Sequence, residues 1–181
     1  MAKIFDSIDD KLAAWITRQR MFFVGTAPTG GGHVNVSPKG PIETLRILDA
    51  NTVAYLDLVG SGAETIAHLR DNGRIVIMLC AFEGGPRIVR LHGSGEILDG
   101  DAIEFPDVDV LAVQQRSVIR VEIDRIADSC GYGVPLMTYA GERSQSRAWA
   151  ERKLAKEGSS ALDDYMAEKN AVSIDGLPAL G

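Results

Sequence analysis

The tripeptide Gly60-Ser61-Gly62 is the first stretch whose residue types could do chemistry. It follows an apolar run and precedes a segment with helical spacing, so it predicts a turn and then a helix over residues 61–71. The spacing Ser61-x-x-Glu64 fits a capping box, in which each side chain satisfies a backbone N–H at the helix start. Free N–H groups at the same helix start, with the positive end of its dipole, could instead hold an anion. From these residues alone both interpretations stay open.

Other polar and basic residues lie close to the ends of predicted strands, in VNVSPKG at residues 34–40 and at Arg87 and Arg90. Each has an ordinary alternative, because SPKG suits a turn and surface arginines are usually solvated. Arg87 and Arg90 are three apart on a candidate strand and therefore face opposite sides. Both can contact one ligand only if a bulge intervenes or one of them reaches across a subunit boundary.

Several kinds of catalytic site have no sequence support. The chain has no GxSxG, HExxH, GxGxxG or GxxxxGK[ST] pattern, which argues against common hydrolase, dinucleotide and P-loop sites. His33, His68 and His92 are widely separated, and we expect His68 to be a surface or packing residue of the short helix. Cys80 and Cys130 are too few for a disulfide framework and lack zinc-ligand spacing. No metal site is expected.

Composition narrows the class of protein. The chain has 181 residues, of which 45% are hydrophobic, enough to bury the core of one soluble domain. Its net charge of −6 and pI near 5.1 would repel nucleic acid and anionic membranes. Acidic residues near the N-terminus and the lack of a long apolar run argue against a signal peptide or a membrane span. We expect a cytoplasmic protein with no nucleic-acid or membrane partner.

Short strand candidates punctuated by Gly, Pro, Asn and Asp dominate the chain after a first helix. That helix is expected to be capped by Ser7-x-x-Asp10 and to end near Arg20. The strand candidates are residues 21–27, 33–37, 45–48, 52–58, 74–82, 88–98 and 118–126. Because only one helix interrupts them, a small antiparallel barrel is favoured over βαβ alternation. Glycines in RIVRLHGSGEIL indicate tight curvature or close backbone approach.

The C-terminal part has a different character. An irregular segment rich in glycine and aromatic residues, CGYGVPLMTYAGERS, precedes a predicted helix over 146–157 and a second helix capped by Ser160-x-x-Asp163. Trp15, the GYGVPLMTY segment and the apolar residues Leu162, Tyr165 and Met166 offer more apolar surface than a small barrel obviously needs. This surface suggests a homodimer, with packing inside one chain as the alternative.

In their order and spacing, FFVGTAP, HVNVSPKG, VAYLDLVGSGAETIAHLRDNGRIVIMLCAFEG and PRIVRLHGSGEIL resemble the FMN-binding split-barrel proteins related to pyridoxamine 5′-phosphate oxidase. The resemblance runs from about Met21 to Leu98. It implies a mainly β (α+β) fold: a six-to-seven-stranded antiparallel split β-barrel with an N-terminal helix, one short helix between strands and C-terminal helices. We expect an FMN-binding split-barrel domain over residues 1–130 and a C-terminal helical extension over 131–181, packing on the same domain.

The resemblance also implies a cofactor site at a homodimer interface. The isoalloxazine ring would be lined by Val36, Ser37 and Lys39. The ribityl phosphate would face a second set, carried over from DLVGSGAET: Asp57, Gly60, Ser61, Gly62 and Thr65. Arg87 and Arg90 would reach the flavin from the next strand, and Arg90 is preferred.

Two departures separate the chain from the oxidase itself. Gly60-Ser61-Gly62 stands where the oxidase has a Ser-Arg-Lys phosphate triplet, and no counterpart of its Trp/Arg-rich C-terminal substrate segment is recognisable. The expected function is therefore that of the broader family: an FMN-dependent oxidoreductase with an unidentified small-molecule substrate, in which the flavin supplies the chemistry. The alternatives are a non-catalytic or ligand-binding homodimer and a related barrel that uses deazaflavin or haem.

Overall fold

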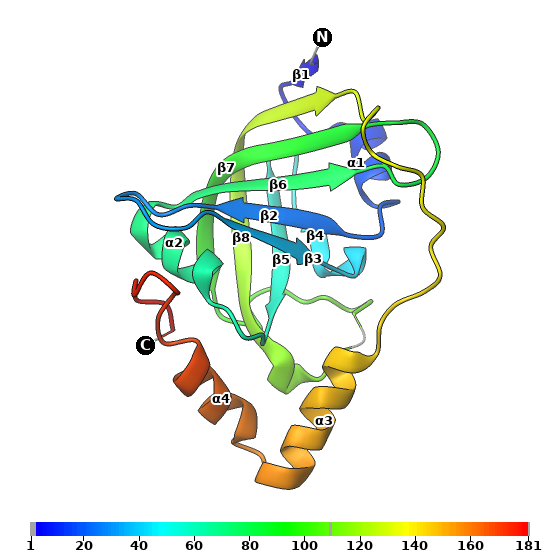
Figure 1. Ribbon diagram of the computed structural model, residues 1–181. Coiled ribbons are helices and arrows are strands. Elements are labelled where there is room, and N and C mark those ends of the chain that lie inside the picture. The colour runs from blue at the N-terminus through cyan, green and yellow to red at the C-terminus, as the bar shows by residue number, and fades with distance from the viewer. Residues whose placement is uncertain (1–2, 109, 181) are drawn as a thin grey trace.

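The computed structural model describes residues 3–108 and 110–180, and an eight-stranded antiparallel sheet dominates it (Figure 1). Seven strands follow the order β3-β2-β6-β7-β8-β5-β4, and β1 pairs with β8. The strands are β1 (Lys3–Phe5), β2 (Phe22–Thr26), β3 (Asn35–Lys39), β4 (Leu45–Ile47), β5 (Thr52–Leu58), β6 (Arg74–Cys80), β7 (Ile88–Leu98) and β8 (Gln115–Ser129). The predicted split barrel is confirmed, with β1 as an additional strand.

The sheet curls so that its two ends approach each other. In Figure 1, β2, β6 and β7 cross in front of β4 and β5, and the long strand β8 links the two layers. Register shifts at His92/Gly93 in β7 and at Asp57/Leu58 in β5 interrupt the ladders that β8 forms with these two strands. A Cβ on Gly93 would collide with the Glu122 backbone of β8, so this glycine is needed for close backbone approach.

Alternation along the strands places the main core inside the curl. In β6, Ile75, Ile77 and Leu79 are buried, whereas Val76 and Met78 face outward and are half-buried. The inward residues join Phe22 and Val24 of β2, Val53 and Tyr55 of β5, and Val89 and Leu91 of β7. Burial of each large apolar side chain is worth about 1.5–3 kcal/mol, so this cluster is the main apolar contribution to the fold.

The edge strand β3 begins two residues later than the sequence indicated, at Asn35 rather than His33. Its ladder with β2 starts at the Thr26–Asn35 pair. His33 is instead held outside the sheet by Asp175, whose carboxylate accepts from its backbone N–H at 2.8 Å. Pro38 is tolerated within β3 because the strand has only one neighbour.

Helix α1 (Asp10–Ile16) covers one end of the curl with Leu12, Trp15 and Ile16. The predicted cap at Ser7 and end near Arg20 are wrong. Asp9 caps the helix, its carboxylate accepting from the Leu12 N–H at 2.7 Å. The helix ends early because the chain turns back after Thr17, where the Gln19 amide donates to the Trp15 carbonyl.

Helix α2 (Glu64–Asn72) lies between β5 and β6 at the opposite end of the curl. It starts three residues later than expected, and its N-cap is Ala63, which makes no side-chain capping bond. The predicted capping box of Ser61 and Glu64 is therefore wrong. Ala63 is instead buried against Ile66 and Ala67, so apolar packing fixes this helix start.

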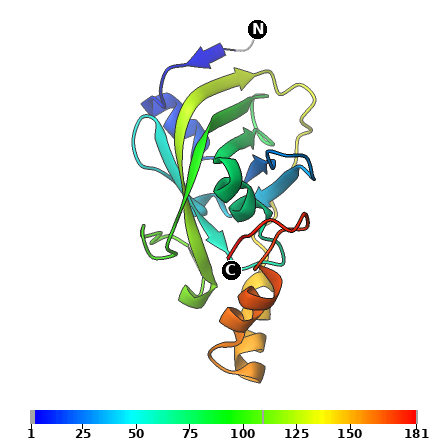
Figure 2. The same ribbon diagram turned by 90° about the vertical axis from the view of Figure 1, so that its left-hand side faces the viewer.

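The C-terminal part adds helices α3 (Gln145–Glu157) and α4 (Ala161–Lys169), joined as a hairpin below the sheet (Figure 2). Both helices were predicted. Trp149 and Tyr165 pack edge to face at 5.1 Å between them. The tail after α4 returns to α2, where Ala179 is fully buried beside Ala63 and Ile66. Within the described ranges, no helix has the length and apolar character needed to span a membrane.

Candidate functional site

A buried carboxylate lies at the centre of the polar region between β3 and β5. Asp57 is fully buried on the inner face of β5, and its side chain bridges two cations. The Lys39 ammonium is 2.7 Å from one carboxylate oxygen, and the Arg116 guanidinium is 2.7 Å from the other. The cluster therefore carries one excess positive charge. Arg116 is 3% exposed and Lys39 is 20% exposed, so Lys39 is the cation that solvent or a ligand can reach.

Charge pairing keeps Asp57 ionised in this buried position. Burial alone would raise its pKa, but Lys39 and Arg116 together outweigh that effect and hold the pKa below its ordinary value. Two residues earlier on the same face, Tyr55 is also fully buried, and burial followed by repulsion from Asp57 raises its pKa well above the usual value. Its hydroxyl has no hydrogen-bond partner among the described residues, so Tyr55 is a neutral phenol.

The turn at residues 60–62 is held by side chains that are distant in sequence. Arg116 donates to the Gly62 carbonyl at 2.8 Å and to the side-chain oxygen of Asn170 at 2.9 Å. Asn170, fully buried at the end of α4, donates in turn to the Gly60 carbonyl at 3.0 Å. The turn conformation thus depends on β8 and on the C-terminal segment.

The turn at residues 60–62 carries hydrogen-bond donors that favour binding of an anion and one carboxylate that opposes it. Ser61 is exposed, and the first N–H groups of α2 have no partner within the helix. However, the Glu64 carboxylate lies against Gly62, where it would collide with any added Cβ. One of its oxygens accepts from the Ile174 N–H at 3.4 Å. Glu64 therefore places negative charge beside the turn.

The inner face of β3 joins a second polar network. Ser37 donates to the Asn35 side chain at 3.0 Å, and Asn35 donates to the hydroxyl of buried Thr65 at 3.0 Å. Asn35 also approaches Thr26, whose hydroxyl lies 2.9 Å from a ring nitrogen of His68. These bonds fix β3 against the first turn of α2.

His68 is fully buried, and its other ring nitrogen has no partner in the described part of the chain. It is thus a packing residue of the core, one of the two roles expected for it. Val36, by contrast, is 65% exposed and faces away from Ser37 and Lys39. The three predicted ring contacts on β3 are therefore split between its two faces.

The two arginines have different environments, as their spacing required. Arg87 donates to the Asp128 carboxylate at 2.8 Å, and its guanidinium lies 4.8 Å from the centre of the Trp15 ring. These contacts connect α1 to the end of β8. Arg90 faces the outer side of the sheet opposite Met78 and donates to the Ser129 hydroxyl at 3.1 Å. Within one chain, neither arginine contacts the Lys39–Asp57 cluster.

The structure brings together most of the residues predicted for the cofactor. Six of them belong to one or the other of the two hydrogen-bonded networks described above: Ser37, Lys39, Asp57, Gly60, Gly62 and Thr65. Ser61 lies at the exposed tip of the turn. Sequence reasoning missed Arg116 and Asn170. The signal that could have found Arg116 is Asp57 itself, a charged residue in the apolar run VAYLDLV. A buried carboxylate requires a neutralising cation, so an arginine or lysine from elsewhere in the chain was to be expected beside it.

A curled antiparallel sheet, with polar residues gathered where β3 approaches β5 and α2, defines a split-barrel protein. The pyridoxamine 5′-phosphate oxidase family model matches residues 8–130. The chain is also 36% identical to the pyridoxamine 5′-phosphate oxidase family protein ustO of Aspergillus flavus, over 99% of this chain and 78% of that protein. The chain therefore belongs to the pyridoxamine 5′-phosphate oxidase family.

Solved structures of low sequence identity are also similar, and two of them illustrate this. A putative pyridoxamine 5′-phosphate oxidase from Lactobacillus delbrueckii is 15% identical with a TM-score of 0.49, covering 68% of this chain and 98% of that one. The FAD-binding protein from Mycobacterium smegmatis is 12% identical with a TM-score of 0.48, covering 70% of this chain and 96% of that one.

Proposed function

We propose that this protein binds FMN and acts as an oxidoreductase on a small organic substrate. The observation that carries the proposal is the Lys39–Asp57–Arg116 cluster, in a chain that belongs to the pyridoxamine 5′-phosphate oxidase family. Its excess positive charge is accessible through Lys39, and Arg116 of the same cluster donates to the Gly62 carbonyl in the turn that precedes α2. A phosphate group would be attracted to this combination of a cation and free backbone N–H groups.

The residues fit the phosphate group of a flavin except for Glu64, whose negatively charged carboxylate would repel it. Lys39 would hold the phosphate, with the Ser61 hydroxyl and the first N–H groups of α2 as further donors. Asp57 would keep Lys39 oriented, and Arg116 and Asn170 would keep the turn in place. Ser37 and the backbone of β3 would lie along the ring. Once bound, the isoalloxazine would supply the hydride or electron transfer, while these residues position it.

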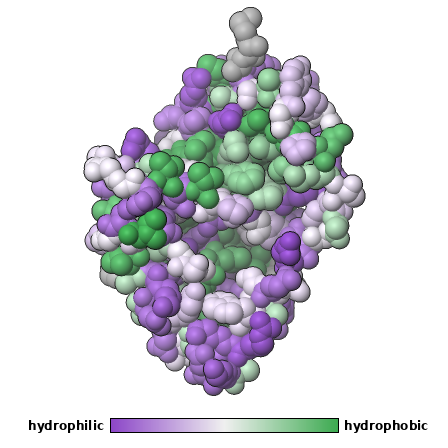
Figure 3. Space-filling model, in the orientation of Figure 1, coloured by the Kyte–Doolittle hydropathy of each residue, from purple (hydrophilic) through white to green (hydrophobic). Residues whose placement is uncertain are grey.

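A homodimer is part of the proposal. The outer face, defined as Phe23, Val36 and Met78, carries apolar side chains across β2, β3 and β6, and exposed Val34 directly precedes β3. Val34 and Val36 are 71% and 65% exposed. Figure 3 shows apolar side chains gathered over the strands at the front of the molecule. Arg90 lies on this outer side of the sheet, and β3 is an edge strand. A flavin along the β3 backbone would reach the outer side at this edge, where a second copy packed on the outer face would bring its Arg90 toward the flavin.

The direct test is cofactor uptake. The purified protein is expected to show a flavin absorbance spectrum, or to acquire one on addition of FMN, and to bind FMN more tightly than riboflavin because riboflavin lacks the phosphate. Lys39→Met should reduce this preference, while Lys11→Met, at an exposed position of α1, should not. A colourless protein that takes up no FMN would refute the proposal. Added deazaflavin and haem then test the other cofactors, and no uptake of any leaves a non-catalytic homodimer.

The oligomeric state is measured separately. Light scattering at micromolar concentration should give the mass of a dimer, because the outer face would otherwise expose its apolar side chains to water. A monomeric mass would remove the proposed dimer interface while leaving FMN binding to be judged on its own titration.

A further inference from the structure

A second hollow lies next to the proposed cofactor site, between the end of β3 and the start of α3. Its volume is about 750 Å³. Its walls come from residues 38–41 at the end of β3, Arg20 and Met21 before β2, Leu58 at the end of β5, and Gly141–Arg147, which include the first turn of α3. Lys39 borders this cavity as well as the Asp57 cluster, so the two sites share one side chain.

Although the protein as a whole is acidic, the ionisable side chains in the described wall of this cavity are mostly basic. Four basic residues line it, Arg20, Lys39, Arg143 and Arg147, whereas Glu142 is the one acidic residue in its described wall. The chain as a whole carries −6. The four come from three separate parts of the chain, and a basic side chain here without a carboxylate partner would favour an anionic ligand.

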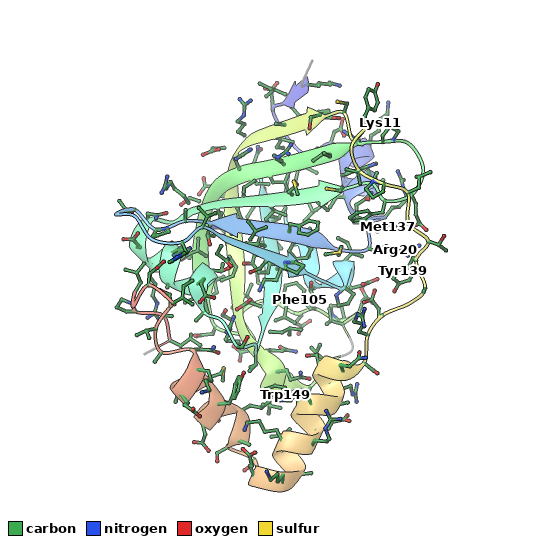
Figure 4. The ribbon with its side chains drawn as sticks, viewed as in Figure 1. Lys11, Arg20, Phe105, Met137, Tyr139 and Trp149 are labelled. Atoms are coloured by element: carbon green, nitrogen blue, oxygen red, sulfur yellow. The ribbon has the colours of Figure 1, made fainter. Side chains whose placement is uncertain are left out.

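Lys39 is paired with Asp57 at 2.7 Å and Arg147 with Glu151 at 2.9 Å, so the positive potential of the described wall comes mainly from Arg143. Arg20 approaches Glu83 at 3.5 Å, and its guanidinium lies 4.4 Å from the centre of the Tyr139 ring. Figure 4 shows the side chains of Arg20 and Tyr139 next to each other. The Glu142 carboxylate accepts from the Tyr139 hydroxyl at 2.5 Å rather than pairing with an arginine. Arg143 forms no ion pair or hydrogen bond with any residue in 3–108 or 110–180.

Further donors face the same cavity. Its wall includes the start of α3, a 13-residue helix whose N-cap Ser144 makes no side-chain capping bond and whose first turn has no acidic residue. Gln114 is 1% exposed, and within the described residues its amide nitrogen makes two long bonds to Ser146, at 3.3 and 3.4 Å. Backbone N–H groups and an incompletely bonded amide are suitable donors to a carboxylate or phosphate.

The remainder of the wall is apolar, with Met21, Pro38, Leu58, Val108 and Val110. A cavity of this size with apolar walls suits the body of a small organic molecule. We propose that it binds an organic anion, with an apolar body against these residues and a carboxylate or phosphate group directed toward Arg143 and the start of α3. The inference rests on the proposed function in one respect: it makes this anion the substrate, because Lys39 adjoins the flavin site.

The test is calorimetric titration of the full chain, with and without FMN, using three probes of similar size. These are 4-phenylbutyrate, phenyl phosphate and the neutral amide 4-phenylbutanamide. At least one anion should bind, more weakly at high salt, and the amide should bind about tenfold less tightly, since one charge-assisted hydrogen bond is worth roughly 1.5–3 kcal/mol. The contrast between carboxylate and phosphate then identifies the head group.

A pair of matched variants locates the binding. Arg143→Gln should weaken the anion about tenfold, by the same charge-assisted bond. Arg152→Gln, an exposed arginine on the same helix α3, should leave it unchanged. Equal affinities of the two variants, equal binding of amide and carboxylate, or competitive displacement of the probe by FMN would each overturn the inference. Anion binding without FMN uptake would refute only the proposed flavin function, and FMN uptake without anion binding would refute only this site.

Discussion

The Lys39 ammonium lies 2.7 Å from the Asp57 carboxylate, and this ion pair connects two parts of the sheet that no backbone ladder joins. Lys39 ends β3, the first strand in the sheet order, and Asp57 lies on β5, the last strand but one. Arg116 of β8 completes the pair on the buried side. The ion pair therefore acts as a side-chain cross-link where the curled sheet stays open.

Replacement of Asp57 should strongly destabilise the fold. Asp57→Asn removes the charge that neutralises buried Arg116 and partly buried Lys39, and loss of one partner of such a pair costs about 3–5 kcal/mol. Urea denaturation followed by circular dichroism measures the free energy of unfolding. Asp124→Asn, at an exposed position of β8, is the control and should stay within about 0.5 kcal/mol of the parent. If the two variants were equally stable, the Lys39–Asp57–Arg116 cluster would not stabilise the sheet as a cross-link.

The same cluster predicts a pH dependence of stability. The pKa of Asp57 in the fold lies below its ordinary value of 3.8. A carboxylate whose pKa is depressed by folding contributes stability that is complete above its unfolded pKa and is lost as the pH falls through its folded pKa. The free energy of unfolding of the parent should thus decrease below about pH 5, over a range that extends beneath 3.8. The Asp57→Asn variant should lack this part of the decrease. If the parent and the variant lose the same amount of unfolding free energy as the pH falls, Asp57 is not its source.

Asn170 should control the turn at 60–62 from the far end of the chain. Asn170→Asp keeps the oxygen that accepts from Arg116 but loses the N–H that donates to the Gly60 carbonyl. An unpaired buried carbonyl costs roughly 1–3 kcal/mol, so we expect lower stability and faster hydrogen exchange of the amides in residues 60–65. If the proposed phosphate site is correct, FMN affinity should fall more than riboflavin affinity. Unchanged exchange in this turn would show that Asn170 does not hold it.

Much of the fold could be predicted because alternation is strong where a strand has one buried face. The strands β5 and β7 have the predicted bounds, and the short helix lies between strands as expected. The errors occur where tertiary contacts override local signals. The three-residue strand β1 has too short a pattern to recognise, and the start of α2 is set by burial of Ala63 rather than by the capping residues nearby.

The candidate site was only partly predictable for a similar reason. Asp57 could be found, since a charge in an apolar strand requires a partner. Arg116 is 59 residues further along the chain and Asn170 is 110 residues from Gly60, and neither has a local pattern that reveals its contacts. Which face of β3 carries which residue follows from its register with β2, and the predicted start of β3 was two residues too early.

Arg90 and Arg87 should respond differently to substitution. Arg90→Gln removes a charge from the outer face and should weaken FMN binding in the proposed dimer with little loss of stability. Arg87→Gln breaks the contacts with Asp128 and the Trp15 ring, so it should lower stability by about 1 kcal/mol and leave FMN affinity unchanged. Flavin titration and thermal denaturation of both variants provide the comparison. An Arg90 variant that binds FMN like the parent would remove this residue from the site.

Ser61 separates the two original interpretations of its tripeptide. It makes no capping bond in the structure, because α2 begins at Glu64 with Ala63 as its N-cap. Ser61→Ala should therefore change the free energy of unfolding by less than about 0.5 kcal/mol, whereas loss of a true cap costs about 0.5–2 kcal/mol. If its exposed hydroxyl contacts the phosphate, the same variant should reduce the preference for FMN over riboflavin while riboflavin affinity stays constant. Denaturation and paired ligand titrations measure both effects, and a preference that survives the substitution would leave the anion to Lys39 and the backbone N–H groups alone.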